Sequence, residues 1–259
     1  MTIPAFEAIH NFRDFGGYVT PDGQVKRGLL FRSAHYADAS ESDLAAFRDM
    51  GMSAIVDLRR PAERVRFATR RHPECGAALI AYGVPSIENE APHLSYLHDE
   101  GVTEATISAR MTAIYRELPY EDGHIEVFGK AFAALPDLKG PIVMHCHAGK
   151  DRTGLICAFI HHALGVSESD ILEDYLATNT KSRIEERLPH LIQTFRDNHG
   201  IEAPAHLMRH IWRVEKGYYD AALEEITARD GSLDAYLEKR LGVTPAMKAA
   251  IRARLIDRG

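Results

Sequence analysis

Short apolar runs and amphipathic stretches alternate along the first 180 residues of the chain. The apolar runs are too short for helices and are bounded by polar or turn-forming residues, which is typical of buried strands. They lie at 29–31, 53–58, 78–84 and 141–145. The apolar residues of 103–118 and 125–135 instead recur at helical spacing. This alternation predicts an α/β fold, with a central, mainly parallel sheet of four to five strands flanked by helices.

Turn and cap signals mark several element ends. Thr20-Pro21-Asp22-Gly23-Gln24 is a turn signal within residues 11–33, and it predicts a hairpin that leads into the first strand. Ser40-Glu41-Ser42-Asp43 is a capping sequence for a helix that Gly51 ends. Pro61 opens a basic helix after the second strand.

The character of the sequence changes near residue 180. Beyond it there is almost no strand signal, and Gly242-Val243-Thr244-Pro245 ends one amphipathic helix and caps the next. We therefore predict a single domain over 1–259, with an α/β core at 1–179 and a helical C-terminal part at 180–259. The polar, unperiodic stretch 85–100 is expected to be a loop or mobile segment.

Composition narrows the classes of partner and compartment. The formal charge of −6 and the pI near 6.2 argue against a nucleic-acid partner, so an anionic ligand must be met by local positive charge. Cys75, Cys146 and Cys157 are odd in number and scattered, which favours a reducing compartment over a disulfide framework. No leader-like N-terminus and no transmembrane run of apolar residues is found, so we expect a cytoplasmic protein. A protein that is exported without a cleaved signal would show the same sequence features.

One decapeptide, residues 145–154, concentrates the candidate chemistry. It lies between a predicted strand and a predicted helix and reads His145-Cys146-His147-Ala148-Gly149-Lys150-Asp151-Arg152-Thr153-Gly154. A loop in this setting aims backbone N–H groups and the positive end of a helix dipole at one point, where an anion binds. Those dipoles favour the thiolate form of Cys146, which is a nucleophile. The Arg152 guanidinium can hold two oxygens of a tetrahedral oxyanion, so the two residues together indicate phosphate-ester chemistry.

The rest of the decapeptide supports these two residues. The predicted oxyanion cradle is the loop backbone, formed by His147, Ala148, Gly149, Lys150, Asp151 and Arg152. The small residues at 148–149 let that backbone approach the ligand. His145 precedes the nucleophile on the strand, so its ring points to the other face and is expected to support the loop. The Thr153 hydroxyl lies beside Arg152.

Charged residues also stand in or beside apolar segments elsewhere. Asp57, at the end of a predicted strand, either lines the cleft of the parallel sheet or forms a structural salt bridge. Arg13 and Asp14 are expected to be paired, because buried charges rarely stand alone. The histidines of 145–147 and 161–162 could suggest a metal site, but adjacent strand residues diverge, so neither a metal nor another cofactor is predicted.

The loop resembles that of the cysteine-dependent protein tyrosine phosphatases, which reads His-Cys-x5-Arg-Ser/Thr. The fuller pattern His-Cys-x-Ala-Gly-Lys-Asp-Arg-Thr-Gly is similar to an atypical bacterial branch with activity on phosphotyrosine and often on phosphoinositides. Further segments similar to that branch lie at 11–18, 27–33, 55–59, 174–176 and 231–233. The resemblance implies a bacterial phosphomonoester hydrolase that forms a cysteinyl-phosphate and releases inorganic phosphate. Its substrates would be phosphotyrosine, phosphoserine or phosphothreonine in proteins, or phosphoinositides.

The resemblance also bears on the general acid. Ordinary tyrosine phosphatases carry it on a Trp-Pro-Asp loop before the cysteine, but the single tryptophan here is Trp212, far downstream. The atypical branch places the acid in the signature loop, which implies Asp151. Asp99, Glu121 and Asp122 stay candidates by position.

Two further expectations concern positive charge near the substrate. Lys150 would add charge for substrates with a second phosphate, a feature shared with inositol-lipid phosphatases. In the family, helices after the core form a lid, which implies gating by residues of about 183–213. The arginines of that segment would face an anionic substrate, or else lie on a solvated helix face: Arg183, Arg187, Arg196, Arg209 and Arg213.

Two other functions stay open. A pseudophosphatase module would bind phosphorylated partners without turnover. A thiol enzyme of the rhodanese or arsenate-reductase type also uses an anion-cradling cysteine loop, but it would favour a resolving cysteine near Cys146. Cys157 instead lies on a predicted helix and faces the core.

Overall fold

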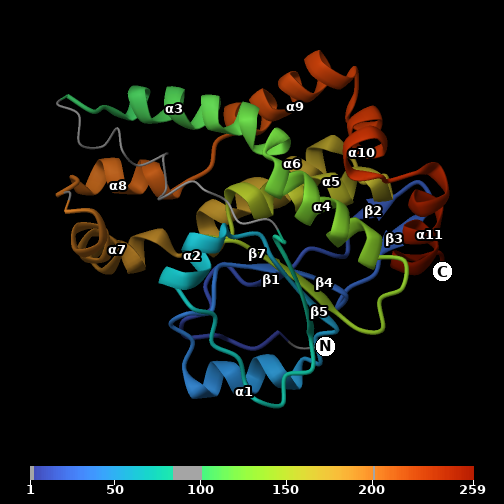
Figure 1. Cartoon of the computed structure of the whole chain (residues 1–259), viewed down its shortest axis with the longest axis horizontal. Helices are drawn as coiled ribbons and strands as arrows, with labels where there is room; N and C mark the ends of the chain where they lie inside the picture. Colours follow the sequence, from blue (N-terminus) through green and yellow to red (C-terminus); the bar gives the residue numbers. More distant parts are fainter. Residues whose placement is uncertain (1–2, 84–100, 201) are drawn as a thin grey trace.

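The computed structural model describes residues 3–83, 101–200 and 202–259. The loop predicted at 85–100 and the candidate acid Asp99 therefore lie outside the described residues. A five-stranded sheet lies at the centre, with helices on both of its faces (Figure 1). Within the described ranges, no helix is both long and apolar enough to cross a membrane.

The central sheet has the strand order β1-β4-β7-β5-β6. Its strands are β1 (Arg13–Asp14), β4 (Leu30–Ser33), β5 (Ala54–Asp57), β6 (Ala78–Ala81) and β7 (Ile142–His145). Strands β4, β7, β5 and β6 run parallel, and β1 pairs antiparallel with β4. The structure thus confirms the predicted mainly parallel sheet, and each predicted apolar run overlaps one of its strands.

The middle position of β7 explains its uninterrupted apolar sequence, because both faces of the strand are covered. Val143 belongs to a core cluster with α1 (Glu41–Asp49) on one face. Met144 belongs to the larger cluster with α4 (Asp122–Ala134) and α5 (Asp151–Leu164) on the other. Figure 1 shows these helices on opposite sides of the sheet.

The carboxyl ends of three parallel strands meet at one edge of the sheet. In the strand register, His145 lies between Ser33 on β4 and Asp57 on β5. Ligands of open α/β sheets bind outside this edge. The decapeptide therefore begins at the centre of that edge, with the loops after β4 and β5 on either side.

A second, small sheet joins the two ends of the chain. It is antiparallel and contains β2 (Val19–Thr20), β3 (Gly23–Val25) and β8 (Ile256–Asp257). The hairpin of β2 and β3 was predicted within residues 11–33, whereas β8 was not, because the sequence after residue 180 shows almost no strand signal. Strand β8 has only two residues, which is too few to show an alternating pattern. It is a strand only because it pairs with β3.

The remaining helices complete the structure. They are α2 (Pro61–Arg66), α3 (Glu104–Glu117), α6 (Glu168–Lys181), α7 (Ile184–His199), α8 (Ala205–Trp212), α9 (Lys216–Asp230), α10 (Leu233–Leu241) and α11 (Pro245–Leu255), with a 3-10 turn at Leu118–Tyr120. Ser40 and Thr244 cap α1 and α11 as predicted, each accepting a hydrogen bond from a first-turn N–H group, and Gly242 ends α10 in a left-handed conformation. Helix α7 packs against α8, and α3 packs against α9 (Figure 1).

Candidate active site

The signature loop connects β7 to α5 with four residues of irregular backbone after Cys146. Cys146 is 1% exposed, and Asp151 is the first residue of α5. Gly149 has a φ of 68°, and a Cβ atom there would lie 2.3 Å from the backbone oxygen of Ser33. Only glycine fits this position, because a side chain would have both an unfavourable backbone conformation and a clash with fixed backbone. The loop thus curls tightly against the end of β4.

The back of the loop is held through its carbonyl oxygens. Asn11 Nδ2 donates to Gly149 O at 2.9 Å, and Arg32 Nη2 donates to the same oxygen at 3.1 Å. Because a peptide group is planar, fixing a carbonyl also fixes the direction of the N–H that follows it. These contacts therefore set the orientation of the loop amides before any anion binds.

Asp174 on α6 neutralises the arginines behind the loop. Its carboxylate lies 3.1 Å from Arg13 Nε and 2.6 Å from Arg32 Nη1, and all three side chains are buried. Burial alone would raise the pKa of the Asp174 carboxyl, but the charges of Arg32 and Arg13 outweigh burial and hold the pKa well below its usual range. Arg13 is thus paired with a carboxylate, as expected, and it also donates to the side-chain oxygen of Asn11, the residue that holds Gly149 O. Asp14 lies elsewhere and accepts hydrogen bonds from the N–H groups of Gly16 and Gly28.

His145 and Asp57 lie under the loop. The His145 ring is fully buried, and its Nδ1 lies 3.3 Å from Cys146 O. Burial lowers the pKa of the ring, which is therefore neutral at pH 7. Asp57 accepts hydrogen bonds from Arg59 Nε at 2.8 Å and Nη2 at 2.7 Å. Of the two alternatives for Asp57, the structure shows the salt bridge.

Arg152 is oriented by a residue that the sequence did not indicate, Glu63 on α2. Arg152 Nη1 lies 2.5 Å and Nη2 2.8 Å from the two oxygens of the Glu63 carboxylate. Burial would raise the pKa of Glu63, but the charge of Arg152 holds it well below its usual range. The carboxylate takes the Nη1 and Nη2 end of the guanidinium, so the edge formed by Nε and Nη2 still presents two N–H groups to an oxyanion. One sequence signal places Glu63 near the site. Its helix begins at Pro61, shortly after a strand whose carboxyl end lies at the edge of the sheet where the loop begins.

Asp151 has a specific partner on α3. Tyr115 Oη donates to Asp151 Oδ1 at 2.7 Å, and Lys150 Nζ lies 3.4 Å from the same oxygen. Of the other candidate acids, Glu121 accepts two hydrogen bonds from Arg60 Nη2, at 2.8 and 2.7 Å. Asp122 is the first residue of α4.

Lys150 is held by backbone carbonyl groups at the C-terminal end of α8. Its Nζ donates to Ile211 O at 2.7 Å and to Arg213 O at 3.3 Å, and the side chain is buried. The ammonium group therefore links the signature loop to the end of α8. The sequence suggested charge for a second phosphate, but in this structure the carbonyl oxygens hold that charge.

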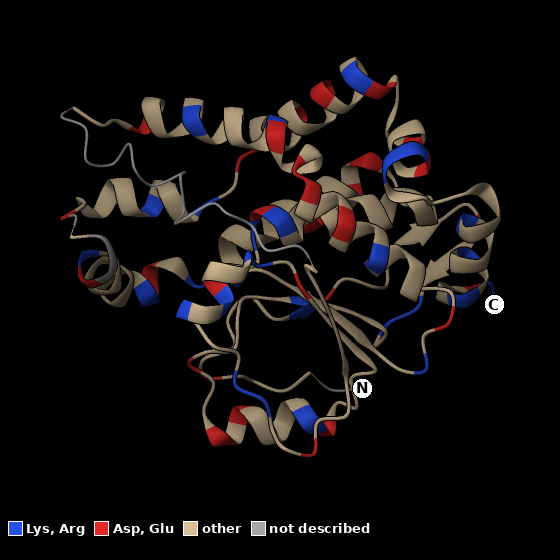
Figure 2. Cartoon of the chain, in the orientation of Figure 1, with Lys and Arg blue, Asp and Glu red and all other residues tan. Residues whose placement is uncertain are grey.

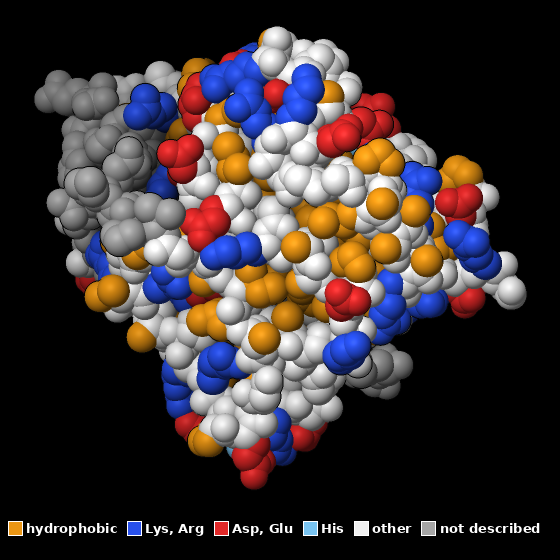
Figure 3. All heavy atoms as spheres, turned by 45° about the vertical axis from the view of Figure 1, so that its right-hand side comes forward, with side chains coloured by type: hydrophobic (Ala, Val, Ile, Leu, Met, Phe, Trp, Pro, Cys, Tyr) orange, Lys and Arg blue, Asp and Glu red, His pale blue; other side chains and the backbone are white. Residues whose placement is uncertain are grey.

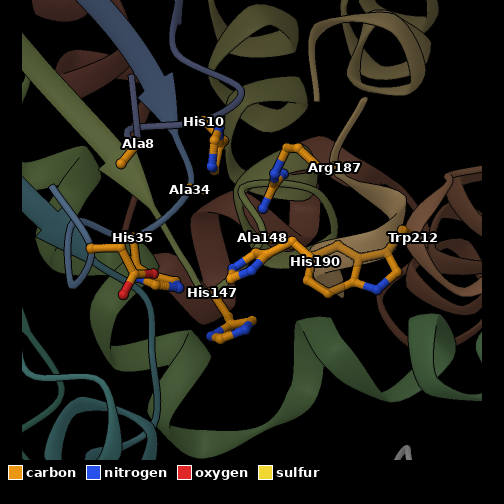
Figure 4. Close-up of a pocket in the computed structure, with 10 residues that line it drawn as sticks. Ala8, His10, Ala34, His35, His147, Ala148, Arg187, His190 and Trp212 are labelled. Carbon is orange, nitrogen blue, oxygen red and sulfur yellow. The ribbon is translucent and has the colours of Figure 1, made fainter. Parts of the chain in front are cut away.

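A cavity of about 140 Å³ lies beside the loop at Ala148 (Figure 4). Arg187 points into it, and most of its other polar or aromatic lining comes from the loops after β4 and β7 and from α7 and α8. Those residues are His10, His35, Asp38, His147, His190 and Trp212. Burial, reinforced by Arg187, lowers the pKa of His10 to about 4, and burial lowers that of His35 to about 4. Besides the histidines, the titratable side chains among the described residues that line the cavity are those of Arg187 and Asp38.

The other four arginines of 183–213 lie on the outside. They pair with acidic neighbours, as Arg183 with Glu186, Arg196 with Glu202, Arg209 with Glu185 and Arg213 with Glu215. Acidic and basic residues are interspersed along the helices (Figure 2). The face in Figure 3 likewise mixes both signs with hydrophobic side chains. Of the five arginines of 183–213, Arg187 is therefore the one that lines the cavity.

The remaining sequence candidates take simple positions. Thr153 is buried next to Arg152, and its Oγ1 has no hydrogen-bond partner among the residues that the structure describes. Cys75, Cys146 and Cys157 are all free thiols. Cys157 lies within α5, and burial raises its pKa to about 12, so it is an inert thiol. In the part of the chain that the structure describes, no three His, Cys, Asp or Glu residues converge as metal ligands do.

Comparison with known proteins decides the family. The model of the tyrosine phosphatase family matches residues 4–257. The chain belongs to the tyrosine phosphatase family. This phosphatase is 32% identical, over 93% of its length and 85% of the other's, to a Cupriavidus necator protein provisionally named a tyrosine-protein phosphatase. It is 26% identical to the triple specificity protein phosphatase PtpB of Mycobacterium tuberculosis, over 99% of this chain and all of that one.

The similar solved structures include the core catalytic domain of the PP-IP phosphatase SIW14 from S. cerevisiae in complex with citrate. It has 15% sequence identity and a TM-score of 0.35, with 75% of this chain and 96% of that chain covered. Family membership and the named relatives make this phosphatase a cysteine-dependent hydrolase.

Proposed function

We propose that this phosphatase hydrolyses phosphomonoesters through a covalent intermediate on Cys146, with Arg152 as the phosphate clamp and Asp151 as the general acid. The observation that carries the proposal is their common placement. All three residues lie within one loop and the first turn of α5, at the carboxyl edge of the parallel sheet. Nucleophile, clamp and acid therefore need no separate loop to close over them.

In the first step, the Cys146 thiolate attacks phosphorus and the bond from phosphorus to the leaving oxygen breaks. Asp151 gives its proton to that oxygen, so an alcohol or phenol leaves and Cys146 carries the phosphoryl group. In the second step, water attacks phosphorus, Asp151 takes a proton from it, and inorganic phosphate and the thiolate are restored. The loop amides and Arg152 stabilise the charge on the phosphoryl oxygens in both steps.

Phosphotyrosine is the proposed main substrate, with phosphoserine, phosphothreonine and phosphoinositides as further ones. The relative from M. tuberculosis is named for triple specificity, which supports a broad range. The cavity beside Ala148 supports it too, because it extends from the loop toward a cation, Arg187. A second phosphate or an acidic side chain of a substrate has a partner there.

Replacing the nucleophile tests the covalent mechanism. Cys146→Ser is expected to abolish turnover of p-nitrophenyl phosphate while the loop still binds vanadate or phosphate, because the amides and Arg152 stay in place. A Cys146→Ser enzyme that keeps its rate would contradict the covalent mechanism.

The general acid is tested separately. Asp151→Asn is expected to lose about 10²- to 10⁴-fold in kcat with phenyl phosphate, a poor leaving group, and far less with 2,4-dinitrophenyl phosphate. Asp122→Asn at the start of α4 is the matched control. Equal losses in the two variants would show that the acid is not in the loop.

A further inference from the structure

Two buried tyrosines form a hydrogen-bonded chain that ends on Asp151. Tyr175 Oη on α6 donates to Tyr115 Oη at 2.8 Å, and Tyr115 Oη on α3 donates to Asp151 Oδ1 at 2.7 Å. Tyr115 is fully buried and Tyr175 is 1% exposed. Neither residue belongs to the signature loop, and they reach it from helices that lie on either side of it in the sequence.

The packing around the chain leaves the hydroxyl groups little freedom. The Tyr175 ring lies against α5 at Gly154, where a Cβ atom would come within 3.0 Å of two ring carbons. The Tyr115 ring contacts those of Tyr175 and Tyr218. The last glycine of the signature decapeptide therefore has a structural purpose, since it lets Tyr175 approach closely enough to reach Tyr115.

The direction of the chain is also fixed. Burial, reinforced by the nearby charge of Asp151, raises the pKa of Tyr115 well above its usual value, so its hydroxyl keeps its proton. Tyr115 Oη accepts a hydrogen bond from Tyr175, so its own hydroxyl hydrogen is available for the hydrogen bond to Asp151. A carboxylic acid carries its proton on one oxygen, and an oxygen that accepts from Tyr115 is the unprotonated one.

We propose that Tyr115, oriented by Tyr175, is a positioning residue that directs the catalytic proton of Asp151 onto Oδ2. This inference rests on the proposed role of Asp151 as the general acid. Protonated Asp151 then presents Oδ2–H to the leaving oxygen, while Oδ1 keeps its hydrogen bond from Tyr115 throughout the reaction. Without the phenol, the carboxyl group can rotate, and its proton can lie on either oxygen.

Other ionisable groups also lie near Asp151. They are Lys150, whose Nζ is 3.4 Å from Oδ1, and the Tyr218 phenol on α9, whose Oη donates to Ser108 Oγ. Tyr115 Oη, at 2.7 Å, is nearer to Oδ1 than the Lys150 ammonium group is.

The test compares Tyr115→Phe with Tyr236→Phe across aryl phosphates of different leaving-group strength. Tyr236 is the matched control, because it is equally buried and its Oη donates to Pro119 O, outside the loop. Tyr115→Phe is expected to lower kcat about 10-fold with phenyl phosphate, a part of the full contribution of a general acid, and less than twofold with 2,4-dinitrophenyl phosphate. Tyr236→Phe is expected to show no dependence on the leaving group.

Tyr175→Phe provides a second variant one step further from the acid. It leaves the hydrogen bond from Tyr115 to Asp151 in place. We therefore expect it to lower kcat in the same direction, more for poor leaving groups than for good ones, but by less than Tyr115→Phe does. It also keeps the inference testable if Tyr115→Phe does not fold. In the background of Asp151→Asn, Tyr115→Phe is expected to add no further leaving-group dependence.

One result would overturn the inference while the proposed function stands. If Asp151→Asn shows strong leaving-group dependence but Tyr115→Phe slows every substrate equally, the tyrosine is only structural. If Asp151→Asn itself shows no leaving-group dependence, then the assignment of the acid fails, and the inference fails with it.

Discussion

The arginines behind the signature loop differ sharply from those of α7 and α8. Arg13 and Arg32 are buried and share the carboxylate of Asp174, and Arg32 also holds a loop carbonyl. Arg183 and Arg209 are exposed and pair with glutamates of α7. The residue type is the same, but its surroundings are not. A buried arginine without its counterion is costly, whereas an exposed ion pair contributes about 0 to 1 kcal/mol.

Arg152 and Arg187 lie between these extremes. Arg152 is buried and held by Glu63, but one edge of its guanidinium stays available for a ligand. Arg187 is half-buried and lines the cavity beside the loop. The comparison therefore predicts three kinds of effect: on folding behind the loop, on turnover at the loop, and on substrate range at the cavity.

The largest effect is expected behind the loop. Asp174→Asn leaves Arg13 and Arg32 without a counterion, and we expect it to lower the free energy of unfolding by about 3 to 5 kcal/mol. Glu186→Gln, which breaks the exposed pair with Arg183, is expected to leave the free energy of unfolding nearly unchanged. Urea unfolding measures both variants. Similar losses in the two would break the distinction between buried and exposed pairs.

A smaller effect, on turnover, is expected at Glu63. Glu63→Gln weakens the bidentate contact that orients Arg152, and a misplaced clamp is expected to lower kcat/KM by about 10- to 100-fold. Glu121→Gln is the control, because Glu121 also accepts two hydrogen bonds from an arginine, Arg60. Steady-state assays with p-nitrophenyl phosphate compare them. An unchanged rate in Glu63→Gln would mean that the loop alone orients the guanidinium.

Burial also makes stability depend on pH through His124. Burial lowers the pKa of His124 to about 3, from about 6.5 in the unfolded chain, and its Nδ1 lies 2.9 Å from Leu118 O. Unfolding below pH 6.5 therefore takes up a proton, so stability is complete above that pH and falls as the pH drops toward 3.

His124→Gln is expected to flatten this dependence by about one proton, which is about 1.4 kcal/mol per pH unit between pH 6 and 4. His162→Gln, on the outer side of α5 beside Asp234, serves as the control. The measurement is the free energy of unfolding by urea at a series of pH values. The same slope in His124→Gln and the parent would show that His124 does not stay neutral in the fold.

The smallest effect is expected at the cavity. Arg187→Gln removes a cation that lines the cavity, so KM for phosphoinositides or acidic phosphopeptides should rise a few-fold while KM for p-nitrophenyl phosphate is unaffected. Arg183→Gln, on the outside of the same segment, should change neither value. A rise in KM in both variants would indicate that the whole segment, and not the cavity, attracts the substrate.

Much of the fold was predictable because its signals are local. The apolar runs gave the parallel strands, and the capping residues Ser40 and Thr244 gave helix starts that the structure confirms. The signature loop was predictable for the same reason. Cys146, Asp151 and Arg152 are within six residues of one another, and a strand followed by a helix is enough to bring them together.

The partners of these residues were not predictable. Glu63 and Tyr115 stand in ordinary helical sequence, and no local pattern separates them from surface residues. Asp174 lies in a segment that carries the family resemblance, but that segment does not indicate which residues Asp174 contacts. The contact that Lys150 makes was not predictable either. Its charge suggested that it binds a second phosphate of a substrate, and in the structure its ammonium group donates to the carbonyl oxygen of Ile211. In each case the contact joins residues far apart in the chain.

The sequence by itself determined the chemistry of the loop and the order of strands and helices, since both depend on neighbouring residues. The tertiary structure decided which carboxylate orients Arg152, which phenol meets Asp151 and which arginine reaches the cavity. Those contacts depend on how helices pack on the sheet, and packing is set by the whole core. The sequence thus determines which groups can react, and the packing determines how they are held.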